Sequence, residues 1–575
     1  MCIRDSRDTG GTRVVIDGTG FGPAGTPVTV TIGGVPALDP EVLDDGHITF
    51  VTPPLPPNTP VDVVYTVGAN PPETLPGAYV PMPAPAAGSP TDTDGDGITD
   101  EIELKYGLDP TNPADANEDP DHDGVPSGTE IVNGTHPTAP WLRYFAEGIN
   151  SNRFNTAIAI ANSSAATMQV QVTYFRQSLA PVRQNLTLTG KTRILVNSAT
   201  VPGLADAAFG VEIAANEAVA ADRTTSWDLG GKDGHSERAV EANRTWYFAE
   251  GATTGRFSLF YLLTNPNDTA TNATVTFLRQ VGTPIVKQYV VPAFARVTIP
   301  VNTTDPGLVS ADLGGIVVAD KPIVAERSMY LSTPTATWDA GTGGTGVTDP
   351  STKWYFGEGA AGDFFDAWIL LSNPGSTDST VDVRYVADNG ADVTKSHVVP
   401  AGHRITIRVV DEDPSLRNTS FGTFVTSTNN VPVVAERAMW WRAYEGQWTA
   451  GHVGIGFING GRKWVTADGV AAPNGTNDTY ALITNTEPRA GMLKVTALFD
   501  DGTAPVEKLY AIGPSQRFTI RGRTQFPEVI GKGYSFVIES IGATPVDIVV
   551  DHSTYWETDG KFWGAGTTAP ASKIK

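Results

Sequence analysis

The chain has 575 residues, among them 60 Gly and 43 Pro, and a formal charge of −23. This length exceeds what one hydrophobic core organises, and it predicts roughly four to six domains. The acidic surface repels phosphate backbones and anionic lipid heads, so nucleic acid and membrane surfaces are poor partners. No run of about 18 apolar residues occurs, and we predict no membrane-spanning segment.

The N-terminus gives no export signal. Its first ten residues read MCIRDSRDTG and lack the apolar segment of a signal peptide. We interpret this start as truncated or artefactual. The only cysteine is Cys2, so no disulfide can form within the chain. The prediction of an extracellular or cell-surface location therefore depends on the modules that follow.

Residues 1–84 are predicted to form an immunoglobulin-like domain. Short runs of alternating apolar and polar residues are separated by Gly- and Pro-rich turns. In order, the segment contains VVIDGTGFG, VTIGGVPA and ITFVTPPLP. This order resembles the IPT/TIG domain. The resemblance implies either a surface receptor or a DNA-binding factor, and the acidic balance favours the surface role.

An acidic spacer is predicted at residues 85–140. From Asp92 it reads DTDGDGITDEIE, with carboxylates, a turn glycine and a closing Glu at the positions of a calcium loop. A second copy, DPDHDGVPSGTE, begins at Asp119. The predicted ligands are side-chain oxygens and, at position seven, a backbone carbonyl: Asp92, Asp94, Asp96, Ile98, Asp100 and Glu103, then Asp119, Asp121, Asp123, Val125, Ser127 and Glu130.

The flanks of these loops differ from those of an EF-hand. The preceding linker is Pro-rich, so only a short helix from about Glu101 to Tyr106 can follow the first loop. Tandem loops of this kind resemble thrombospondin type 3 repeats, which implies Ca²⁺ as the cofactor. We expect the second site to be weaker because Ser127 is a poorer ligand than a carboxylate. The alternative is a solvated acidic linker without an ion.

The remainder of the chain contains four copies of one repeat, which we place at 141–243, 244–352, 353–462 and 463–575. The copies open with RYFAEG, WYFAEG, WYFGEG and WVTADG. Their strands alternate apolar and polar residues, which predicts a two-sheet sandwich. The pattern WYFAEG…NP…VPA…VAER resembles repeats of secreted bacterial proteins. That family has no assigned activity to carry over.

Two acids recur in each of the first three copies and raise the question of catalysis, because glycosidases use two carboxylates. The pairs are Glu147 with Asp222, Glu250 with Glu326, and Glu358 with Glu436. An Arg follows the second acid each time. A structural ion pair is copied in every repeat, whereas a catalytic site rarely is. We therefore predict that Glu250 approaches Arg327 and that Glu358 approaches Arg437.

The predicted fold class is all-β, with tandem immunoglobulin-like β-sandwich domains in an extended rod and a small calcium-loop spacer. No HExxH, GxSxG, P-loop or dinucleotide motif occurs, so we predict no enzyme activity. The predicted function is structural or adhesive, with a surface glycan or a protein as partner. The alternative is a carbohydrate-binding accessory region of a larger extracellular enzyme. Exposed tryptophans would favour sugar binding, and buried ones a structural role.

Overall fold

The computed structural model divides into two compact units, Met1–Thr138 and Ala139–Lys575. It describes residues 13–17, 20–23, 25–44, 47–55, 61–79, 91–106, 108–118, 126–128, 131, 141–177, 179–228, 232–333, 337–441, 448–558 and 560–574. No helix in this described part is both long enough and apolar enough to cross a bilayer.

The first unit begins with a small β-sandwich. One sheet has the order β1-β5-β4 and the other β3-β2-β6-β7. The strands are β1 (Arg13–Asp17), β2 (Val28–Ile32), β3 (Val35–Pro36), β4 (Leu38–Asp44), β5 (His47–Val51), β6 (Val61–Val67) and β7 (Glu73–Tyr79). Apolar side chains of both sheets, among them Ile32, Phe50 and Tyr79, form the core between them.

The elements with described bounds in the spacer are a short helix, α1 (Asp100–Tyr106), and a 3-10 turn, η1 (Asp115–Asn117). Its apolar core is very small, with Ile98, Leu108 and Ala116 buried together. So little apolar surface cannot offset the conformational entropy lost on ordering the loops around it. Polar contacts within the acidic loop therefore have to supply much of the order.

The second unit contains the four repeats, here called repeats 1 to 4 with the bounds given above. Repeat 1 contains β8 (Trp141–Phe145), β9 (Ile149–Asn150), β10 (Phe154–Asn162), β11 (Met168–Arg176), β12 (Val182–Leu188), β13 (Thr192–Asn197), η2 (Ser198–Thr200), β14 (Ala207–Ala215), β15 (Ala220–Trp227) and β16 (Asp233–Arg238). Repeat 2 contains β17 (Asn243–Phe248), β18 (Phe257–Asn265), β19 (Thr271–Arg279), β20 (Ile285–Val291), β21 (Ala295–Pro300), α3 (Val301–Thr304), η3 (Pro306–Leu308), β22 (Leu313–Leu331) and β23 (Ala340–Thr345).

The other two repeats follow the same order. Repeat 3 contains β24 (Lys353–Phe356), β25 (Ala360–Ala361), β26 (Phe365–Ser372), β27 (Ser379–Ala387), β28 (Asp392–Val399), β29 (Arg404–Arg408), α4 (Val409–Glu412), η4 (Pro414–Leu416), β30 (Thr419–Ser427), β31 (Val434–Trp441) and β32 (Ala450–Ile455). Repeat 4 contains β33 (Lys463–Val465), β34 (Gly469–Val470), β35 (Asn477–Asn485), β36 (Gly491–Phe499), β37 (Val506–Ile512), β38 (Arg517–Arg521), α5 (Gly522–Gln525), η5 (Pro527–Val529), β39 (Gly533–Ile541), β40 (Ile548–Thr558), β41 (Lys561–Pro570) and β42 (Ser572–Lys573).

Each repeat is a sandwich of two sheets, as the alternating sequence predicts. In repeat 3 the sheets have the orders β24-β30-β27-β28 and β29-β26-β31-β32. Strand β27 alternates buried and half-buried residues along its whole length, so one face packs on the opposite sheet. The long strand β22 of repeat 2 serves both sheets, since it pairs with β19 in one and with β18 in the other.

The recurring Asn at the end of the second strand holds the following turn in place. In repeat 3 the side-chain amide of Asn373 donates to the carbonyls of Thr377 and Val399, at 2.8 and 2.9 Å. Its carbonyl oxygen accepts from Gly375 N at 2.9 Å. Asn162, Asn265 and Asn485 make the same three kinds of bond. The motif is therefore internal to each sandwich.

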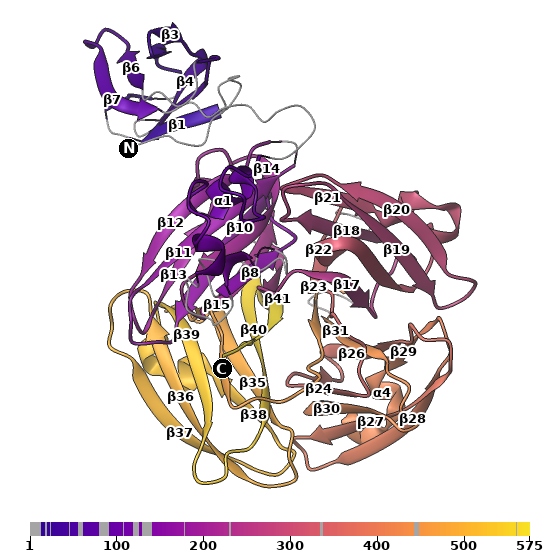
Figure 1. The fold of residues 1–575 in the computed structure, drawn as a ribbon. Coiled ribbons are helices and arrows are strands. Elements are labelled where there is room, and N and C mark those ends of the chain that lie inside the picture. The colour runs from indigo at the N-terminus through magenta and orange to yellow at the C-terminus, as the bar shows by residue number, and fades with distance from the viewer. Residues whose placement is uncertain are drawn as a thin grey trace. The chain divides into compact units, whose positions relative to one another are not determined.

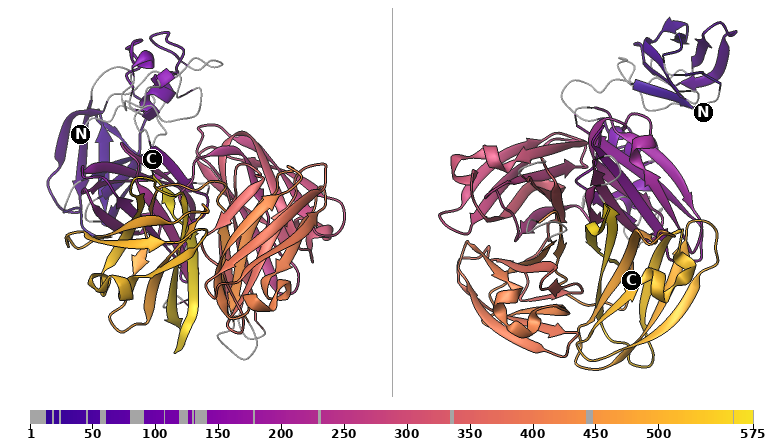
Figure 2. Two further views of the ribbon diagram at one scale, coloured as in Figure 1. Left: turned by 90° about the horizontal axis from the view of Figure 1, so that it is seen from below. Right: turned by 180° about the vertical axis from the view of Figure 1, so that it is seen from behind.

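The four repeats close into a ring, so the prediction of an extended rod is wrong for this part of the chain (Figures 1 and 2). Repeat 4 returns to repeat 1, where Thr192 of β13 pairs in parallel with Phe499 of β36. Successive head-to-tail contacts generate a ring when their rotations add up to a full turn. The sequence repeat shows that the joints are alike, but it does not give the angle at each joint.

A similar contact holds each joint between consecutive repeats: a carboxylate of one repeat accepts one or two backbone amides of the repeat before it. At the joint of repeats 1 and 2, Glu326 accepts hydrogen bonds from the backbone amides of Ala146 and Glu147, at 2.9 and 3.1 Å. Arg223 of repeat 1 pairs with that carboxylate at 2.5 Å and with Glu147 at 3.5 Å. The guanidinium and both carboxylates are buried. We call this arrangement the joint clamp.

The predicted ion pairs are confirmed, and they belong to the joint clamps. Arg327 lies 3.5 Å from Glu250 within repeat 2 and 2.9 Å from Glu436 of repeat 3. Arg437 lies 2.8 Å from Glu358. The sequence alone indicated only the pairs within a repeat. The second acid reaches into the preceding repeat, and this contact across the joint was not foreseen.

A shorter clamp closes the ring between repeats 4 and 1. Asp222 accepts from the amides of Ala467 and Asp468, at 2.5 and 3.0 Å, and lies 3.3 Å from His552 Nε2. Here Asp takes the place of Glu and His the place of Arg. A carboxylate bound by backbone amides is thus common to all four joints, whereas, among the described contacts, an arginine pairs with that carboxylate only between repeats 1 and 2 and between repeats 2 and 3.

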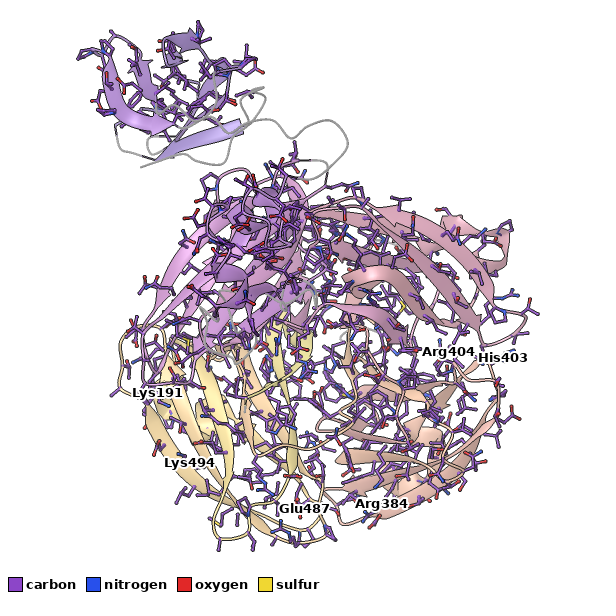
Figure 3. All side chains as sticks on the ribbon, viewed as in Figure 1. Lys191, Arg384, His403, Arg404, Glu487 and Lys494 are labelled. Atoms are coloured by element: carbon purple, nitrogen blue, oxygen red, sulfur yellow. The ribbon has the colours of Figure 1, made fainter. Side chains whose placement is uncertain are left out.

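A second arginine crosses each joint. Arg404 of β29 donates to the carbonyl of Gly251 in repeat 2 at 3.0 Å, and Figure 3 shows it at the border of repeats 2 and 3. Arg296, Arg517 and Arg193 bond the corresponding turns of repeats 1, 3 and 4. Each acidic turn is thus held from the next repeat by a carboxylate on its amides and a guanidinium on its carbonyls.

Four strands surround the centre of the ring. β16, β23, β32 and β41 contact one another in a closed cycle. Small residues allow this close approach: a Cβ on Gly343 would lie 2.3 Å from the His235 ring. At the equivalent position of these strands, defined by the pairing with the preceding strand, a histidine alternates with a threonine around the ring: His235, Thr342, His452 and Thr567.

We predict that breaking a joint clamp destabilises the ring strongly. Glu436→Gln should lower the free energy of unfolding by about 3–5 kcal/mol, because Arg327 is left buried without its closest charge. Glu241→Gln is the control, since Glu241 pairs with Arg143 at 2.6 Å but its side chain is 70% exposed. Its loss should cost about 0–1 kcal/mol. Urea unfolding curves compare the two, and equal losses would contradict the clamp.

The buried histidines connect ring stability to pH. Burial lowers the pKa of His452 to about 4, against the opposing charge of Glu358 at 3.6 Å. Burial alone would raise the pKa of Glu358, but His452, Arg437 and two hydroxyls lower it to about 2. In the folded ring His452 is therefore neutral at pH 6, whereas an unfolded histidine binds a proton near pH 6.5.

We predict that His452 makes the ring sensitive to acid. Because its folded pKa lies below the unfolded value, stability is lost as the pH falls from 6.5 toward 4, by up to about 3 kcal/mol. His452→Gln should remove this part of the loss. Tyr555→Phe is the control: it removes the 3.1 Å contact to His452 Nε2 but keeps the imidazole. The loss should persist there, as urea unfolding at several pH values would show.

Candidate functional site

The first acidic loop folds around its own carboxylates. Asp92 accepts from the amides of Gly95 and Gly97, at 2.8 and 3.1 Å, and Asp96 accepts from Ile98 N at 2.8 Å. Carboxylate oxygens of Asp92, Asp94 and Asp96 lie within 4.8 Å of one another. Gly97 has φ +96°, a left-handed conformation that Gly adopts without strain. The sequence-predicted turn is therefore present.

A second group of oxygens lies beside the first and shares Asp96. It brings Asp96, Glu103 and Asp115 within 4.8 Å. Glu103 is 0% exposed, and neither of its carboxylate oxygens has a hydrogen-bond partner among the described residues. One oxygen each of Asp94, Asp96 and Asp115 is likewise buried and unpartnered. Unpaired buried carboxylates are costly, and a bound cation would compensate them.

Asp115 is a functional candidate that sequence reasoning missed. It lies outside the twelve-residue loop pattern, on η1, and its second oxygen accepts from Asp109 N at 2.8 Å. The chain leaves α1 and turns back through Leu108, which brings η1 against the loop. The structure shows this fold-back because Ala116 is buried against Ile98 and Leu108. The sequence pattern alone does not indicate that η1 packs against the loop.

Asp100 and Ile98 differ in role from the other predicted ligands. The Asp100 carboxylate accepts from the amide and the hydroxyl of Thr93, at 2.7 and 2.6 Å, so it ties the start of the loop to the helix. The Ile98 side chain is buried in the spacer core. The structure therefore gathers Asp92, Asp94, Asp96 and Glu103, but not Asp100, around the site.

The second loop is described only in part. The predicted ligands Asp119, Asp121, Asp123, Val125 and Glu130 lie outside the described residues. Ser127 is described and buried, and its amide and hydroxyl both donate to the carbonyl of Glu118, at 2.9 and 3.0 Å. The predicted second site thus stays a prediction.

The electrostatics of the first loop agree with a cation site. Burial, together with the charges of Asp94, Asp96 and Asp115, raises the pKa of Glu103 to about 8. Burial also raises the pKa of Asp94. Calcium prefers six to eight oxygen ligands, often with a Glu that binds through both oxygens. The unpartnered oxygens and the turn at Gly97 fit this ion, with Glu103 in the closing position.

The burial of the tryptophans bears on whether the repeats bind sugar or have a structural role. All twelve tryptophan side chains are buried or half-buried. Those that open repeats 2, 3 and 4 are 1% exposed: Trp246, Trp354 and Trp464. The indole N–H of Trp354 donates to the carbonyl of Val433 at 2.8 Å. The three that open these repeats fill sandwich cores and joints, so they form no exposed row for sugar stacking.

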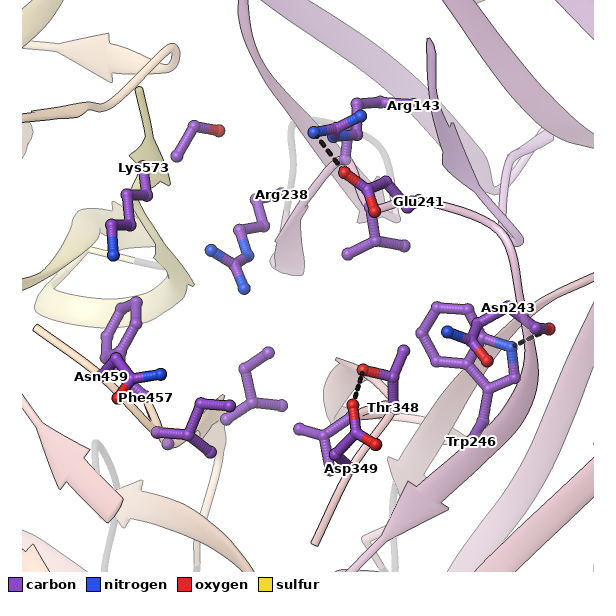
Figure 4. A pocket seen from close by; sticks show the side chains of 18 of the residues that line it. Arg143, Arg238, Glu241, Asn243, Trp246, Thr348, Asp349, Phe457, Asn459 and Lys573 are labelled. Carbon is purple, nitrogen blue, oxygen red and sulfur yellow. Dashed lines mark hydrogen bonds and ion pairs between the residues drawn. The ribbon is translucent and has the colours of Figure 1, made fainter. Parts of the chain in front are cut away.

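A cavity of about 420 Å³ lies where the linkers between repeats come together (Figure 4). Its wall is charged and mixed in sign. Arg143 pairs with Glu241 at 2.6 Å, Arg238 donates to the carbonyl of Ala571 at 3.3 Å, and Lys573 donates to the carbonyl of Gly460. The first contact lies within repeat 1, the second links repeats 1 and 4, and the third links repeats 4 and 3.

Comparisons with known proteins identify part of the chain. Residues 7–79 match the IPT/TIG domain family. This confirms the immunoglobulin-like domain predicted at the N-terminus. A search of curated proteins finds no match.

Two solved structures give low structural similarity. "Crystal Structure of Thermotoga maritima 1070" is 15% identical, with a TM-score of 0.17, covering 19% of this chain and 95% of that one. "Crystal structure of tetra-tandem repeat in extending region of large adhesion protein" is 13% identical, with a TM-score of 0.09, covering 73% of this chain and 95% of that one.

We predict that calcium binding depends on Glu103 and on Asp115. Glu103→Gln and Asp115→Asn should each weaken calcium binding by at least about tenfold, since each removes a charged oxygen ligand. Asp109→Asn is the matched control, because the Asp109 side chain accepts from Thr111 and lies outside both oxygen groups. Calorimetric titration of the full chain measures the three affinities. Equal losses in all three would contradict the site.

Proposed function

We propose that this chain is a non-catalytic extracellular protein with a structural or adhesive role, in which a calcium-stabilised spacer precedes a ring of β-sandwiches. The IPT/TIG domain supports the extracellular part of the proposal, because such domains occur in surface receptors. The net charge of −23 supports it as well, since an acidic chain avoids nucleic acid.

One observation carries the non-catalytic part: the paired acids that invited a catalytic interpretation are occupied by the joint clamps. Glu250 and Glu436 are buried on the two sides of Arg327. A glycosidase needs its two carboxylates beside a space that admits substrate and water. Carboxylates that are buried and bonded to an arginine and to backbone amides cannot act in glycoside hydrolysis.

The test is turnover by the full chain. Purified protein with calcium should release no product from a panel of polysaccharides and peptides. Glu250→Gln and Glu358→Gln serve as the variants. Hydrolysis by the wild type that either substitution abolishes would overturn the proposal.

The calcium part of the proposal predicts where the chain is cut after chelation. The spacer core is very small, and its five carboxylates repel one another without a cation. Binding stabilises the ordered form by about 2.7 kcal/mol at a hundredfold excess of calcium over Kd. Limited proteolysis with a chelator should therefore cut residues 91–140 first and leave the ring intact. Cleavage inside the repeats before the spacer would contradict this role.

A further inference from the structure

Three of the four joints are filled by a cluster of aromatic rings, which we call the joint plug. At the joint of repeats 1 and 2 the plug consists of Phe154, Tyr330 and Trp338, whose ring centroids lie 4.8–6.1 Å apart. At the next two joints it consists of Phe257, Trp440 and Trp448, then of Phe365, Tyr555 and Trp563. Each plug takes its first ring from one repeat and the other two from the next.

The ring-closing joint of repeats 4 and 1 has no such plug. Strand registers identify the equivalent positions. Asn477 is equivalent to Phe154, because each is the first residue of its strand, β35 or β10. Ser226 is equivalent to Tyr330, because each pairs with a glycine at the same place in the next strand, Gly234 or Gly341. An amide and a hydroxyl thus replace two aromatic rings. In the sequence, Gly231 takes the place of the third aromatic residue of the plug. Gly231 lies outside the described part of the chain.

A cavity of about 370 Å³ lies at this joint. The residues that line it come from repeats 1 and 4 and are mostly polar: Thr224, Ser226, Ser236, Asp468, Val470, Thr476, Asn477, His552, Thr554, Trp556, Glu557, Thr567 and Ala569. The size falls within the range of small-molecule sites, about 300–1,000 Å³. The clamp at this joint has shorter side chains, which leave more space. Asp468 is accordingly 26% exposed, whereas the equivalent Glu147 at the first joint is 3% exposed.

Some polar atoms in the wall of this cavity have no partner in the protein. Among the described residues, His552 Nδ1 and Thr567 Oγ1 are buried without a hydrogen bond. Others form a network that faces the cavity: the hydroxyls of Thr224 and Ser236 lie 2.6 Å apart, and Thr224 donates to Asp468 at 2.9 Å. Buried polar groups left unpaired are costly, so a ligand rich in hydroxyls would be stabilised here.

We propose that the ring-closing joint is a binding site for a neutral sugar, of the size of a mono- or disaccharide. Six hydroxyl side chains and the amide of Asn477 offer donors and acceptors, and Trp556 offers a flat apolar ring beside them. The Asp468 charge is offset by Arg193 at 3.4 Å, and the second carboxylate in the wall, Glu557, is exposed to solvent, which screens its attraction for a cationic ligand. The proposal names a ligand for the adhesive role proposed above and rests on it.

The decisive variant rebuilds the plug at this joint. Ser226→Tyr with Asn477→Phe inserts the two rings that the other joints carry, so it should fill the cavity without opening the ring. Its matched control is Ser396→Tyr with Asn389→Phe, which adds the same rings at two exposed positions of repeat 3. Ser226→Ala keeps the cavity open and removes one hydroxyl. Circular dichroism and thermal unfolding establish that each variant folds.

The probes are glucose, galactose, N-acetylglucosamine and cellobiose, with putrescine as a cationic competitor class, all in calcium buffer with the full chain. Saturation-transfer NMR and calorimetry measure binding. We expect at least one sugar to bind the wild type and the exposed control equally. Binding should weaken by about fivefold in Ser226→Ala, as for one hydrogen bond, and vanish in the plugged variant.

Three results would overturn the proposal: no sugar bound by the wild type at tens of millimolar, sugar binding retained in a folded plugged variant, or putrescine bound in preference to every sugar. A missing sugar site would leave the turnover and chelation tests unaffected. Conversely, hydrolysis of a bound sugar would overturn the non-catalytic function while leaving the site in place. The failures of the two proposals are thus distinguishable.

Discussion

The ring depends on one interaction, a buried carboxylate that accepts two backbone amides of the preceding repeat. Glu326 does this at the first joint and Asp222 at the last. A carboxylate removed from water is stable only when its lone pairs are satisfied and its charge is balanced. At the first joint the amides and Arg223 meet both needs, and at the last joint one oxygen of Asp222 accepts both amides and lies 3.3 Å from His552 Nε2. Each sandwich therefore completes its polar contacts only beside its neighbours.

Sequence patterns predicted the sandwich fold because alternation and turn residues are local signals. The register of four motifs also predicted the pairs Glu250–Arg327 and Glu358–Arg437, which lie within one repeat. The contact of Glu436 with Arg327 was not foreseen, since nothing local shows that an acid reaches into the repeat before it. The ring in place of a rod has the same cause: the angle between neighbouring repeats leaves no mark in the periodicity of the residues.

The acidic spacer shows the same division between local and distant signals. The loop pattern located Asp92, Asp94, Asp96 and Glu103, because a turn and its ligands are adjacent in the chain. Asp115 reaches the site only through the fold back from α1 to η1. The copies also differ at the joints: Ser226 and Asn477 occupy positions at which the other three joints have aromatic rings. This difference can be recognised only from the strand registers, because the sequence does not show which residues meet at a joint.

The crowded centre limits the symmetry of the ring. His235 occupies the space that a Cβ on Gly343 would need, so a large residue on one central strand requires a small one on the next. The alternation of histidine and threonine around β16, β23, β32 and β41 follows this rule. Four sandwiches that each carried a histidine at this position would overpack the axis. The smallest unit from which such a ring can be generated by rotation is accordingly a pair of unlike repeats, related by a twofold rather than a fourfold axis.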